Sequence, residues 1–340
     1  MLSAEIKGRA KELGYVACGI IPSATFHEHI HFLDERAAAF PGSKKLYERF
    51  YANATPPEAG RSIIVCTESC AQYKVPDALN GVIGKLYLFD GSIPYSHERR
   101  RELEFETYLK TLGLNTIEHK LPSRWAAAKA GVGAFGRNNF IYSQEHGSYI
   151  LILSWVVDKE LDYDTPSENT FSENGLAAGC DESCQKCVQA CPTQALSGAL
   201  SMDIGKCVAR LSYFAKDILD EDTRTRMGPW LYGCDVCQDV CPLNQGKLTG
   251  TEAFPLLSEF ERYLTLEAIF EMSEDVYMNV ILPRFSYTGK DGLWLWKANA
   301  LRSMINSADS KYHCLIKKSC GSTDERIREV GRWGCEKLGL

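Results

Sequence analysis

The stretch CDESCQKCVQACP (180–192) decides the architecture, together with a second run, CDVCQDVCP (234–242). In both runs the cysteines are separated by two or three residues, and both runs end in Cys-Pro. A [4Fe–4S] cluster needs a thiolate at each corner, and such short spacings let one loop wrap around an edge of the cube. The two runs therefore predict two [4Fe–4S] clusters in a protein that transfers single electrons at low potential.

The ligands of the two clusters are expected to cross between the runs, because in two-cluster ferredoxins the cysteine before the proline ligates the other cluster. The first cluster then takes Cys180, Cys184, Cys187 and Cys241. The second takes Cys191, Cys207, Cys234 and Cys237. Three residues follow Cys180 before the next cysteine, where the usual ferredoxin run has two. A pair of zinc sites is the weaker alternative, since zinc binds Cys-x2-Cys pairs but does not use a Cys-Pro partner shared between runs.

Composition narrows the class of protein. The chain has 340 residues, enough for two or three domains, and 14 cysteines. It has no apolar run of about eighteen residues, and its first ten residues carry charges where a signal peptide is apolar. We therefore expect a cytoplasmic protein without a membrane segment, whose cysteines serve metal or redox chemistry. The net charge of −6 disfavours a protein wrapped in nucleic acid but leaves room for a local basic patch that meets RNA.

The N-terminal half has the hydrophobic pattern of an α/β (α+β) domain. Apolar residues at helical spacing over 6–13 precede a short strand over 16–21, and SIIVCT (62–67) is a second strand. The charged segment 97–112 predicts an amphipathic helix. The run YILILSWVV (149–157) is apolar throughout, which predicts a strand buried on both faces.

The rest of the chain divides at a polar segment. Residues 162–179 are rich in Pro, Ser, Asn and Gly and predict a linker or a draping loop. Amphipathic helices are expected over 293–305 and 324–338 after the cysteine runs, where they would form a solenoid-type hairpin. The predicted regions are 1–165, an α/β domain; 175–250, the two-cluster ferredoxin-like module; and 254–340, a short helical region.

A glycine-rich segment, AGVGAFGRNNF (130–140), superficially matches a dinucleotide-binding loop through Gly131, Gly133 and Gly136. A dinucleotide loop follows a strand and opens a helix, whereas here a helical stretch comes first and a strand follows. A nicotinamide or flavin site is therefore disfavoured. Two interpretations remain: a loop that presses against another large ligand, with Arg137 and Asn138 as donors, or a tight turn without a ligand.

Several of these stretches together resemble a known family, the epoxyqueuosine reductases, which are cobalamin-dependent iron–sulfur enzymes related to the reductive dehalogenases. The matching stretches are KELGYVACGI (11–20), RSIIV (61–65), AGVGAFGRNN (130–139), GSYILIL (147–153), CQKCVQACPTQAL (184–196) and YGCDVCQDVCPLN (232–244). The resemblance therefore runs from near the start to about residue 245, with a shortened helical, HEAT-like tail after it.

The resemblance implies a nitroreductase-like corrinoid-binding domain joined to a ferredoxin module. Electrons would pass from an external ferredoxin- or flavodoxin-type donor through the two clusters to the cobalt of cobalamin, and tRNA would be a possible partner. The positions that fall where the family holds cobalamin are Gly131, Gly133, Ala134, Phe135, Gly136, Arg137, Asn138, Ile141, Ile152, Ala209 and Asp235.

One departure from the family concerns its proton donor. The family places an aspartate fourteen residues before the first glycine of the loop, and this sequence has Ile117 there. Glu118 and His119 are the nearest groups that can supply a proton. A leaving hydroxyl must be protonated during reductive removal of oxygen, so either side chain is a candidate acid.

Two other functions compete with a reductase of this kind. One is an electron-transfer protein that reduces a partner corrinoid or flavoprotein and has no substrate site. The other is a reductive dehalogenase-like enzyme, in which Tyr95, just before the basic helix, would be the proton donor. In the C-terminal tail, basic and acidic residues are interleaved over 324–332, which is typical of a solvated helix surface rather than of an RNA-docking stripe.

Overall fold

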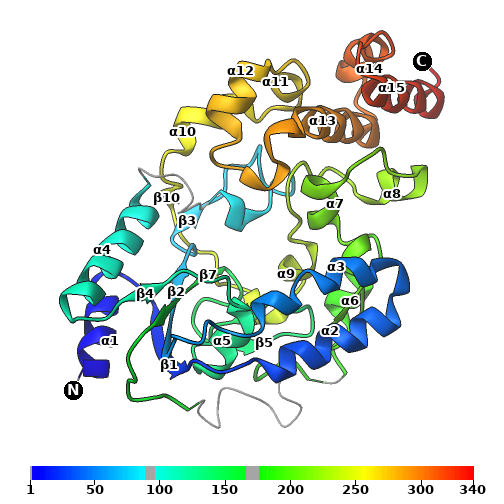
Figure 1. The fold of residues 1–340 in the computed structure, drawn as a ribbon. Helices are drawn as coiled ribbons and strands as arrows, with labels where there is room; N and C mark the ends of the chain where they lie inside the picture. The colour runs from blue at the N-terminus through cyan, green and yellow to red at the C-terminus, as the bar shows by residue number, and fades with distance from the viewer. Residues whose placement is uncertain (1, 89–95, 166–175, 182) are drawn as a thin grey trace.

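The structure is a computed structural model that describes residues 2–88, 96–165, 176–181 and 183–340 (Figure 1). Tyr95 and most of the expected linker, 166–175, lie outside the described residues. At the centre of the N-terminal half is an antiparallel sheet with the strand order β1-β2-β7-β4. Its strands are β1 (Ala17–Pro22), β2 (Ser62–Ser69), β7 (Ile150–Val157) and β4 (Thr116–Ile117).

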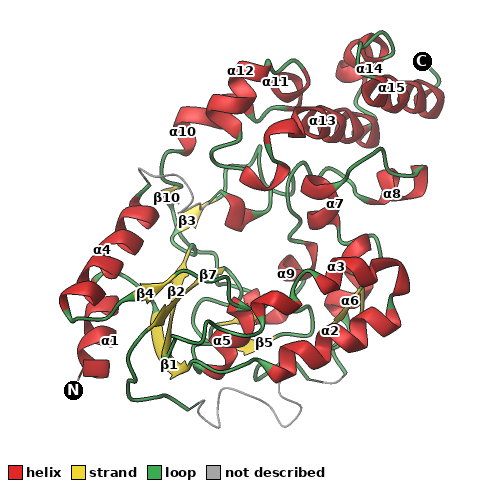
Figure 2. Cartoon of the chain, viewed as in Figure 1, coloured by secondary structure: helices red, strands yellow, loops and turns green. Residues whose placement is uncertain are grey.

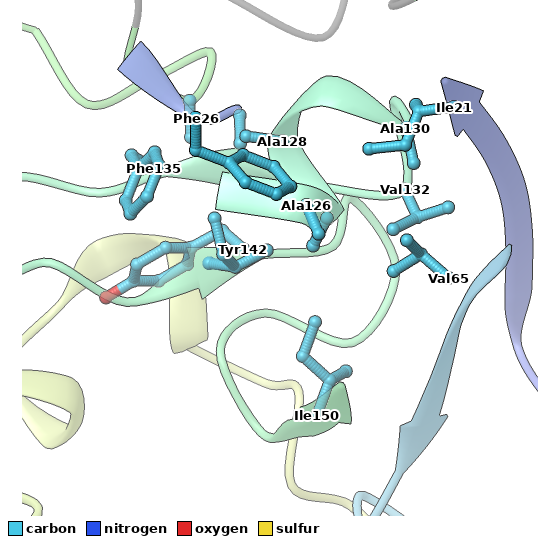
Figure 3. Close-up of a cluster of buried hydrophobic side chains, with 14 of the residues drawn as sticks. Ile21, Phe26, Val65, Ala126, Ala128, Ala130, Val132, Phe135, Tyr142 and Ile150 are labelled. Carbon is cyan, nitrogen blue, oxygen red and sulfur yellow. The ribbon is translucent and has the colours of Figure 1, made fainter. Parts of the chain in front are cut away.

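Alternation along the strands builds two apolar layers, because successive side chains point to opposite faces of a sheet. One face packs against α1 (Leu2–Glu12) and α4 (His97–Thr111) in a cluster that includes Ile64 and Trp155. The other face packs against α5 (Ser123–Lys129), as Figure 3 shows for its alanines. The predictions of helices over 6–13 and 97–112 and of strands over 16–21 and 62–67 are confirmed.

The expectation for β7 is wrong in one respect that matters later. Its ends are buried, but the four residues 151–154 in its middle are only half-buried. α5 is seven residues long and covers only part of this face. On the α5 face this leaves Ile152 and Ser154 partly uncovered, whereas Leu153 lies on the face that packs against α1 and α4.

The cysteine module follows the sheet and consists of short elements. Its helices are α6 (Lys186–Ala190), α7 (Val208–Phe214), α8 (Glu221–Arg226) and α9 (Val236–Asp239). Between the first two helices lie a small hairpin, β8 (Leu196–Gly198) with β9 (Ser201–Met202), and a 3-10 turn, Ile204–Lys206. α6 and α9, one from each cysteine run, pack against each other. This contact brings the two runs together.

Helices make up most of the C-terminal region, seen at the top of Figures 1 and 2. They are α10 (Leu257–Phe260), α11 (Leu266–Phe270), α12 (Glu274–Val276), α13 (Leu293–Ser307), α14 (His313–Ser319) and α15 (Glu325–Leu338). α15 packs against both α13 and α14, so the predicted helices over 293–305 and 324–338 are confirmed. Among the described residues, no helix is both long and apolar enough to cross a membrane.

The segment that follows β2 joins the C-terminal helices to the sheet. Ile83 and Leu88 lie in one buried cluster with Tyr232 of the cysteine module and with Phe285 and Trp296 of the C-terminal region. A short parallel pair, β3 (Tyr73–Lys74) with β10 (Glu252–Ala253), reinforces the connection. The three regions therefore pack against one another and are not joined by flexible linkers alone.

Candidate functional site

The seven cysteines of the two runs and Cys207 between them are all at least half-buried, and they form two groups. In the first group, burial raises the pKa of the Cys187 thiol to about 11. The neighbouring thiols that raise it further are those of Cys180, Cys241 and Cys184. Cys241 belongs to the second run, so this group crosses between the runs.

The second group is built in the same way. Burial raises the pKa of the Cys234 and Cys237 thiols above the ordinary value. The thiols of Cys207 and Cys191 raise both further, and Cys191 belongs to the first run. Four buried thiols that disfavour one another's charge suit a cationic iron centre, which binds thiolates and releases their protons.

The extra residue after Cys180 is accommodated by a turn at Asp181. The Asp181 carboxylate accepts hydrogen bonds from the Cys184 backbone N–H at 2.9 Å and from the Ser183 hydroxyl at 2.6 Å. An aspartate that bonds to the backbone a few residues ahead is a common way to close a turn. The longer spacing therefore still brings Cys184 back beside Cys180.

The glycine-rich segment forms a small hairpin, β5 (Ala134–Phe135) with β6 (Ile141–Tyr142). Its glycines are required by the packing of the hairpin itself. A Cβ atom on Gly133 would lie 2.4 Å from Cγ2 of Ile141, and one on Gly136 would lie 2.3 Å from Cε2 of Tyr142. Gly131 has φ 68°, in the left-handed region that favours glycine. The predicted contacts Ala134, Phe135 and Ile141 are buried in the same core.

Two predicted donors of this hairpin face the cysteine loops. The backbone N–H of Arg137 donates to Sγ of Cys180 at 3.4 Å, and its guanidinium donates to the carbonyl of Asp181 at 3.3 Å. Asn138 Nδ2 donates to the Tyr142 hydroxyl at 2.9 Å and to the carbonyl of Cys237 at 3.1 Å. The hairpin therefore touches both cysteine groups.

The Tyr142 side chain lies between the two groups. Burial raises the pKa of its phenol above the usual range, and Cys241 of the first group and Cys237 of the second raise it further. The phenol is thus neutral and donates a hydrogen bond toward Cys241. Tyr142 was not singled out in the sequence, where it reads as one more apolar residue after the glycine loop.

A cavity of about 470 Å³ opens beside the half-buried middle of β7. Small-molecule sites typically have volumes of this order. The lining residues come from β7, from the segment before α5, from α4 and from a turn near residue 53: Asn53, Glu102, His119, Lys120, Leu121, Ser123, Ile152, Leu153 and Ser154. The cavity brings together two residues singled out from the sequence, Ile152 and His119.

The two candidate acids differ in their placement. Nε2 of His119 is buried and has no hydrogen-bond partner within the described part of the chain. Glu118 is exposed and is not among the residues that line the cavity. Ile117, at the position of the family aspartate, pairs with Val156 in the sheet and packs on the apolar core.

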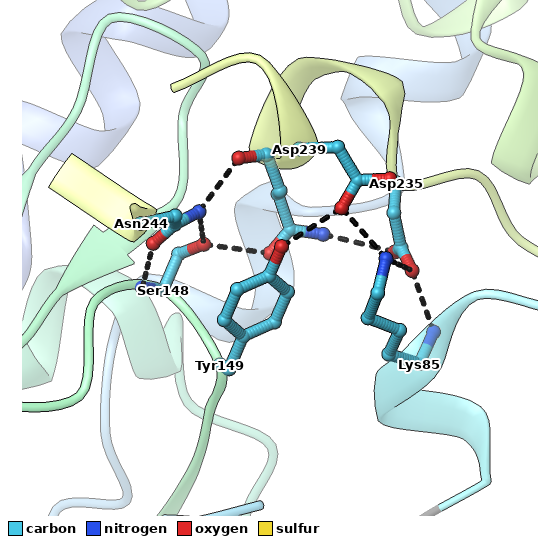
Figure 4. A network of polar contacts seen from close by, with 7 residues as sticks. Lys85, Ser148, Tyr149, Asp235, Asp239 and Asn244 are labelled. Atoms are coloured by element: carbon cyan, nitrogen blue, oxygen red, sulfur yellow. Dashed lines mark hydrogen bonds and ion pairs between the residues drawn. The ribbon is translucent and has the colours of Figure 1, made fainter. Parts of the chain in front are cut away.

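Asp235 lies in a buried polar network (Figure 4). Its carboxylate accepts from the backbone N–H of Lys85 at 2.7 Å, and burial raises its pKa to about 6 against the opposing charge of Lys85. The ammonium of Lys85 lies 2.6 Å from Asp239, which also accepts from the Tyr149 hydroxyl at 2.9 Å. This network fastens the second cysteine loop to the sheet and to the segment after β2. Ala209 is half-buried on α7, and its carbonyl accepts from Ser212.

Comparison with known proteins agrees with this geometry. A family described as "4Fe-4S double cluster binding domain" matches residues 164–244. The epoxyqueuosine reductase of Cyclobacterium marinum is 32% identical over 167 residues, 49% of this chain and 51% of that protein. That of Bacillus subtilis is 36% identical over 128 residues, 38% of this chain and 30% of that protein. The matches thus span about half or less of these relatives.

Solved structures extend the likeness to the whole fold. A structure of the Bacillus subtilis enzyme, with its catalytic aspartate loop swung out of the active site, gives a TM-score of 0.79 at 23% identity, covering 99% of this chain and 90% of that one. An epoxyqueuosine reductase with a modified tRNA stem loop gives 0.77 at 24%, covering 100% and 90%. The chain resembles epoxyqueuosine reductases in sequence and in fold. The predicted resemblance and the two-cluster binding domain are confirmed, and the matched domain is an iron–sulfur domain rather than a zinc domain.

Residues of the epoxyqueuosine reductase-like fold that the sequence did not reveal include Lys85, Tyr149 and Asp239. Lys85 is a lone basic residue in an apolar stretch, which is easily taken for a surface position. Asp239 gave no signal either, because its half-exposed carboxylate has the pattern of an ordinary surface residue between two cysteines.

Proposed function

We propose that this protein is a cobalamin-dependent, double [4Fe–4S] reductase that acts in the cytoplasm on epoxyqueuosine in tRNA. The observation that carries the proposal is that one fold holds both a cavity, lined by Ile152 and His119, and two groups of four thiols that are at least half-buried. The names of the relatives support this activity, and a solved relative holds a tRNA stem loop. A ferredoxin- or flavodoxin-type donor would supply the electrons.

The thiol groups define the proposed cluster ligands. One cluster binds Cys180, Cys184, Cys187 and Cys241. The other binds Cys191, Cys207, Cys234 and Cys237. Backbone N–H groups point at two of these sulfurs, Arg137 N–H at Cys180 and Ala195 N–H at Cys191, at 3.4 and 3.2 Å. Such hydrogen bonds to sulfur raise the reduction potential of a cluster.

The cavity is the proposed corrinoid-binding site in a nitroreductase-like domain. At about 470 Å³ it accommodates one edge of a corrinoid and not the whole cofactor: Leu121, Ile152 and Leu153 form its apolar wall, and Asn53 and Ser123 offer polar groups to amide side chains. Bound cobalamin supplies a low-potential cobalt centre for reductive cleavage of carbon–oxygen bonds. The glycine hairpin and Ala209 do not line this cavity, and we propose them as contacts for the part of the corrinoid that lies outside it. Arg137, Asn138 and Asp235 support it indirectly, by holding the cysteine loops.

His119 is the proposed proton donor in place of the family aspartate. It lines the cavity, and its buried Nε2 atom has no protein partner within the described residues, so the ring turns toward the cavity to reach a bound substrate. Proton donation to the oxygen that leaves from carbon contributes to the rate of such a reduction. Glu118 is exposed and lies outside the lining of the cavity, so it does not fill this role.

Anaerobic reconstitution tests the proposal. The purified protein should hold about eight iron atoms, from two cubane clusters, and about one cobalt, and added cob(II)alamin should change its spectrum on binding. Ile152→Trp, which narrows the cavity with a bulky ring, should lower the cobalt content and leave the iron content unchanged. Leu103→Trp, at an exposed position on α4, is the matched control and should keep both metals.

Turnover then separates the remaining functions. Conversion of epoxyqueuosine to queuosine in a tRNA stem loop by the reconstituted protein supports the proposal. Iron without any cobalamin binding overturns it and leaves an electron-transfer protein. Cobalamin binding with dehalogenation of an aryl halide, and no turnover of the nucleoside, overturns it in favour of a dehalogenase-like enzyme, for which the proposed donor Tyr95 lies outside the described residues.

A further inference from the structure

Two cysteines of the C-terminal helices lie in contact with each other, outside the cysteine module. Sγ of Cys320, at the end of α14, is 3.5 Å from Sγ of Cys335 on α15. The two residues are 15 positions apart in the chain, and both side chains are only half-buried. We call Cys320 and Cys335 the tail thiol pair.

Close packing of α14 and α15 holds the tail thiol pair together (Figure 1). A Cβ atom on Gly331 of α15 would lie 3.0 Å from the backbone nitrogen of Cys320 and 2.2 Å from Oγ of Ser319. Cys335 follows Gly331 by one helical turn, so both residues lie on the same side of α15. The backbones of the two helices therefore approach closely beside the two sulfurs.

This approach leaves a short distance for a covalent bond to close. The sulfurs of a disulfide are about 2.05 Å apart, so those of the tail thiol pair have to move together by about 1.5 Å. Rotation of the two side chains can supply a displacement of this size. In a reducing cytoplasm such a pair is kept as two thiols, and disulfides that form there are transient and respond to oxidation.

Other cysteines outside the module differ from the tail thiol pair in contact or in access. Cys66 lies opposite Cys18 in the pairing of β1 with β2, but Cys66 is fully buried in the core beneath α1 and α4. Cys70 is also buried, and its thiol donates to the carbonyl of Tyr149 at 3.5 Å. Cys314 is exposed on α14 and offers an accessible thiol for comparison.

The surroundings of Cys335 set the pace of its oxidation. Burial and the neighbouring Cys320 sulfur raise the pKa of the Cys335 thiol, and the positive charge of Lys317 opposes this shift. The Cys335 thiol is therefore protonated near neutral pH. Because the thiolate is the form that attacks an oxidant, we expect the pair to react slowly and to respond to sustained oxidation.

We propose that the tail thiol pair is an oxidation site that forms a reversible disulfide when the protein meets a peroxide. One sulfur attacks hydrogen peroxide as a thiolate, so that a sulfur–oxygen bond forms, the oxygen–oxygen bond breaks and hydroxide leaves as water with the proton of the thiol. The second sulfur then displaces the hydroxyl group of the sulfenic acid, and a second water leaves. The two thiols lose two electrons and two protons, which the peroxide takes up, and a dithiol reductant reverses the reaction.

The disulfide would fasten the helices that support the second cysteine loop. α15 packs against both α14 and α13. On α13, Asn299 Nδ2 donates to the carbonyl of Leu231 at 3.0 Å, and the Arg302 guanidinium donates to the carbonyl of Trp230. These carbonyls belong to the segment that leads into Cys234. A cross-link stabilises the folded state mainly by restricting the unfolded chain, so oxidation should strengthen this support.

Peptide mapping of the anaerobically reconstituted full chain tests the bond. The protein is treated with rising doses of hydrogen peroxide, up to the dose that bleaches the iron–sulfur absorbance, and free thiols are then alkylated with iodoacetamide. Trypsin places the three cysteines of the tail in separate peptides, 312–317, 319–326 and 333–337. We expect mass spectrometry to find 319–326 joined to 333–337, two hydrogen atoms lighter than their sum, and dithiothreitol to separate them. Peptide 312–317 should stay unlinked.

Variants of the three cysteines make the mapping decisive. Cys314→Ser is the matched control and should form the same cross-link as the parent protein. Cys320→Ser and Cys335→Ser should each leave the remaining cysteine of the pair unlinked. Two alkylated peptides at every dose overturn the proposal. Linkage of 319–326 or 333–337 to any other cysteine peptide, or between two chains, in place of the expected bond also overturns it.

Hydrogen exchange measures the effect of the bond on the fold. Backbone amides of α14 and α15 should exchange about tenfold or more slowly in the oxidised parent protein than after dithiothreitol. The segment 228–234 should change in the same direction, and Cys335→Ser treated with peroxide should show neither change. A disulfide without slower exchange in the two helices overturns the fastening role. The inference goes beyond the proposed function, and neither measurement involves cobalamin or tRNA, so a failure of that function does not affect this test.

Discussion

The cysteine module and the cavity beside β7 are built in opposite ways. Seven of the eight cysteines of the module stand within the two short runs, and their spacing alone indicates which metal centre they bind. The cavity is lined by residues from four segments that are far apart in the sequence, between Asn53 and Ser154. No local sequence pattern predicts it. A metal centre is thus specified by local spacing, whereas the cavity arises from the way distant segments pack around the middle of β7.

The crossing of the cluster ligands gives the largest expected effect. Cys191→Ala and Cys207→Ala should each lose one cluster, about four of about eight iron atoms, and retain the same remaining cluster by electron paramagnetic resonance. Cys241→Ala and Cys187→Ala should retain the other. Cys314→Ala, at an exposed position outside the module, should keep all the iron. If Cys191→Ala gave the spectrum of Cys187→Ala, each run would hold its own cluster and the crossing would be refuted.

A second prediction concerns the chemistry of the cavity. His119→Gln should lower kcat by roughly 10²- to 10⁴-fold, the usual contribution of general acid catalysis, with iron and cobalt contents unchanged. Glu118→Gln should have less than about a twofold effect, because its exposed side chain does not line the cavity. Equal losses of kcat in the His119 and Glu118 variants would contradict the assignment of His119 as the proton donor.

The third prediction tests how strictly the glycine hairpin is packed. Gly133→Ala places a Cβ atom 2.4 Å from the Ile141 side chain and 3.0 Å from the carbonyl of Tyr142, and overpacking of this kind costs about 1–3 kcal/mol. Gly8→Ala, on the exposed side of α1 with nothing within 4 Å of its Cβ, should instead stabilise by about 0.5–1 kcal/mol. Urea unfolding of the reconstituted proteins measures both. If Gly133→Ala left the free energy of unfolding unchanged, the hairpin would have room for an added methyl group, contrary to the structure.

The smallest effect is expected at the end of β2. Burial raises the pKa of Glu68 to about 7, although its ion pair with Arg101 opposes the shift. The folded state therefore holds an extra proton between about pH 4.5 and 7, so stability falls as the pH rises through this window. Unfolding free energy should drop by about 1–2 kcal/mol from pH 5 to pH 8 and lose this dependence in Glu68→Gln. Glu160→Gln, an exposed position, should keep the parent profile; a pH dependence that survives in Glu68→Gln would assign it to another group.

The sequence predicted the elements whose signals are local. Helices over 97–112, 293–305 and 324–338 and the strand over 62–67 were found because their periodicity lies within one element. The cysteine runs were found for the same reason. The grouping of Cys241 with Cys180 followed from chemistry known for ferredoxins, not from periodicity.

The predictions fell short where the outcome depends on distant packing. The apolar run of β7 gives no sign that its middle is left half-covered, because that depends on the length of α5. The glycines of 131–136 indicated close approach, but the partners are Ile141 and Tyr142 of the same hairpin. Lys85 could not be found at all, since its acidic partners lie about 150 residues further along the chain.

The contact of Arg137 with the first cysteine loop links iron binding to the stability of the sheet domain. The hairpin donates to Cys180 Sγ and to the Asp181 carbonyl, so the loop and the hairpin order each other. By thermodynamic reciprocity, the free energy by which an ordered hairpin tightens iron binding equals the free energy by which bound iron stabilises the hairpin. Iron loading of the first cysteine group and ordering of the glycine hairpin are thus thermodynamically coupled, and a chain starved of iron has a less stable hairpin.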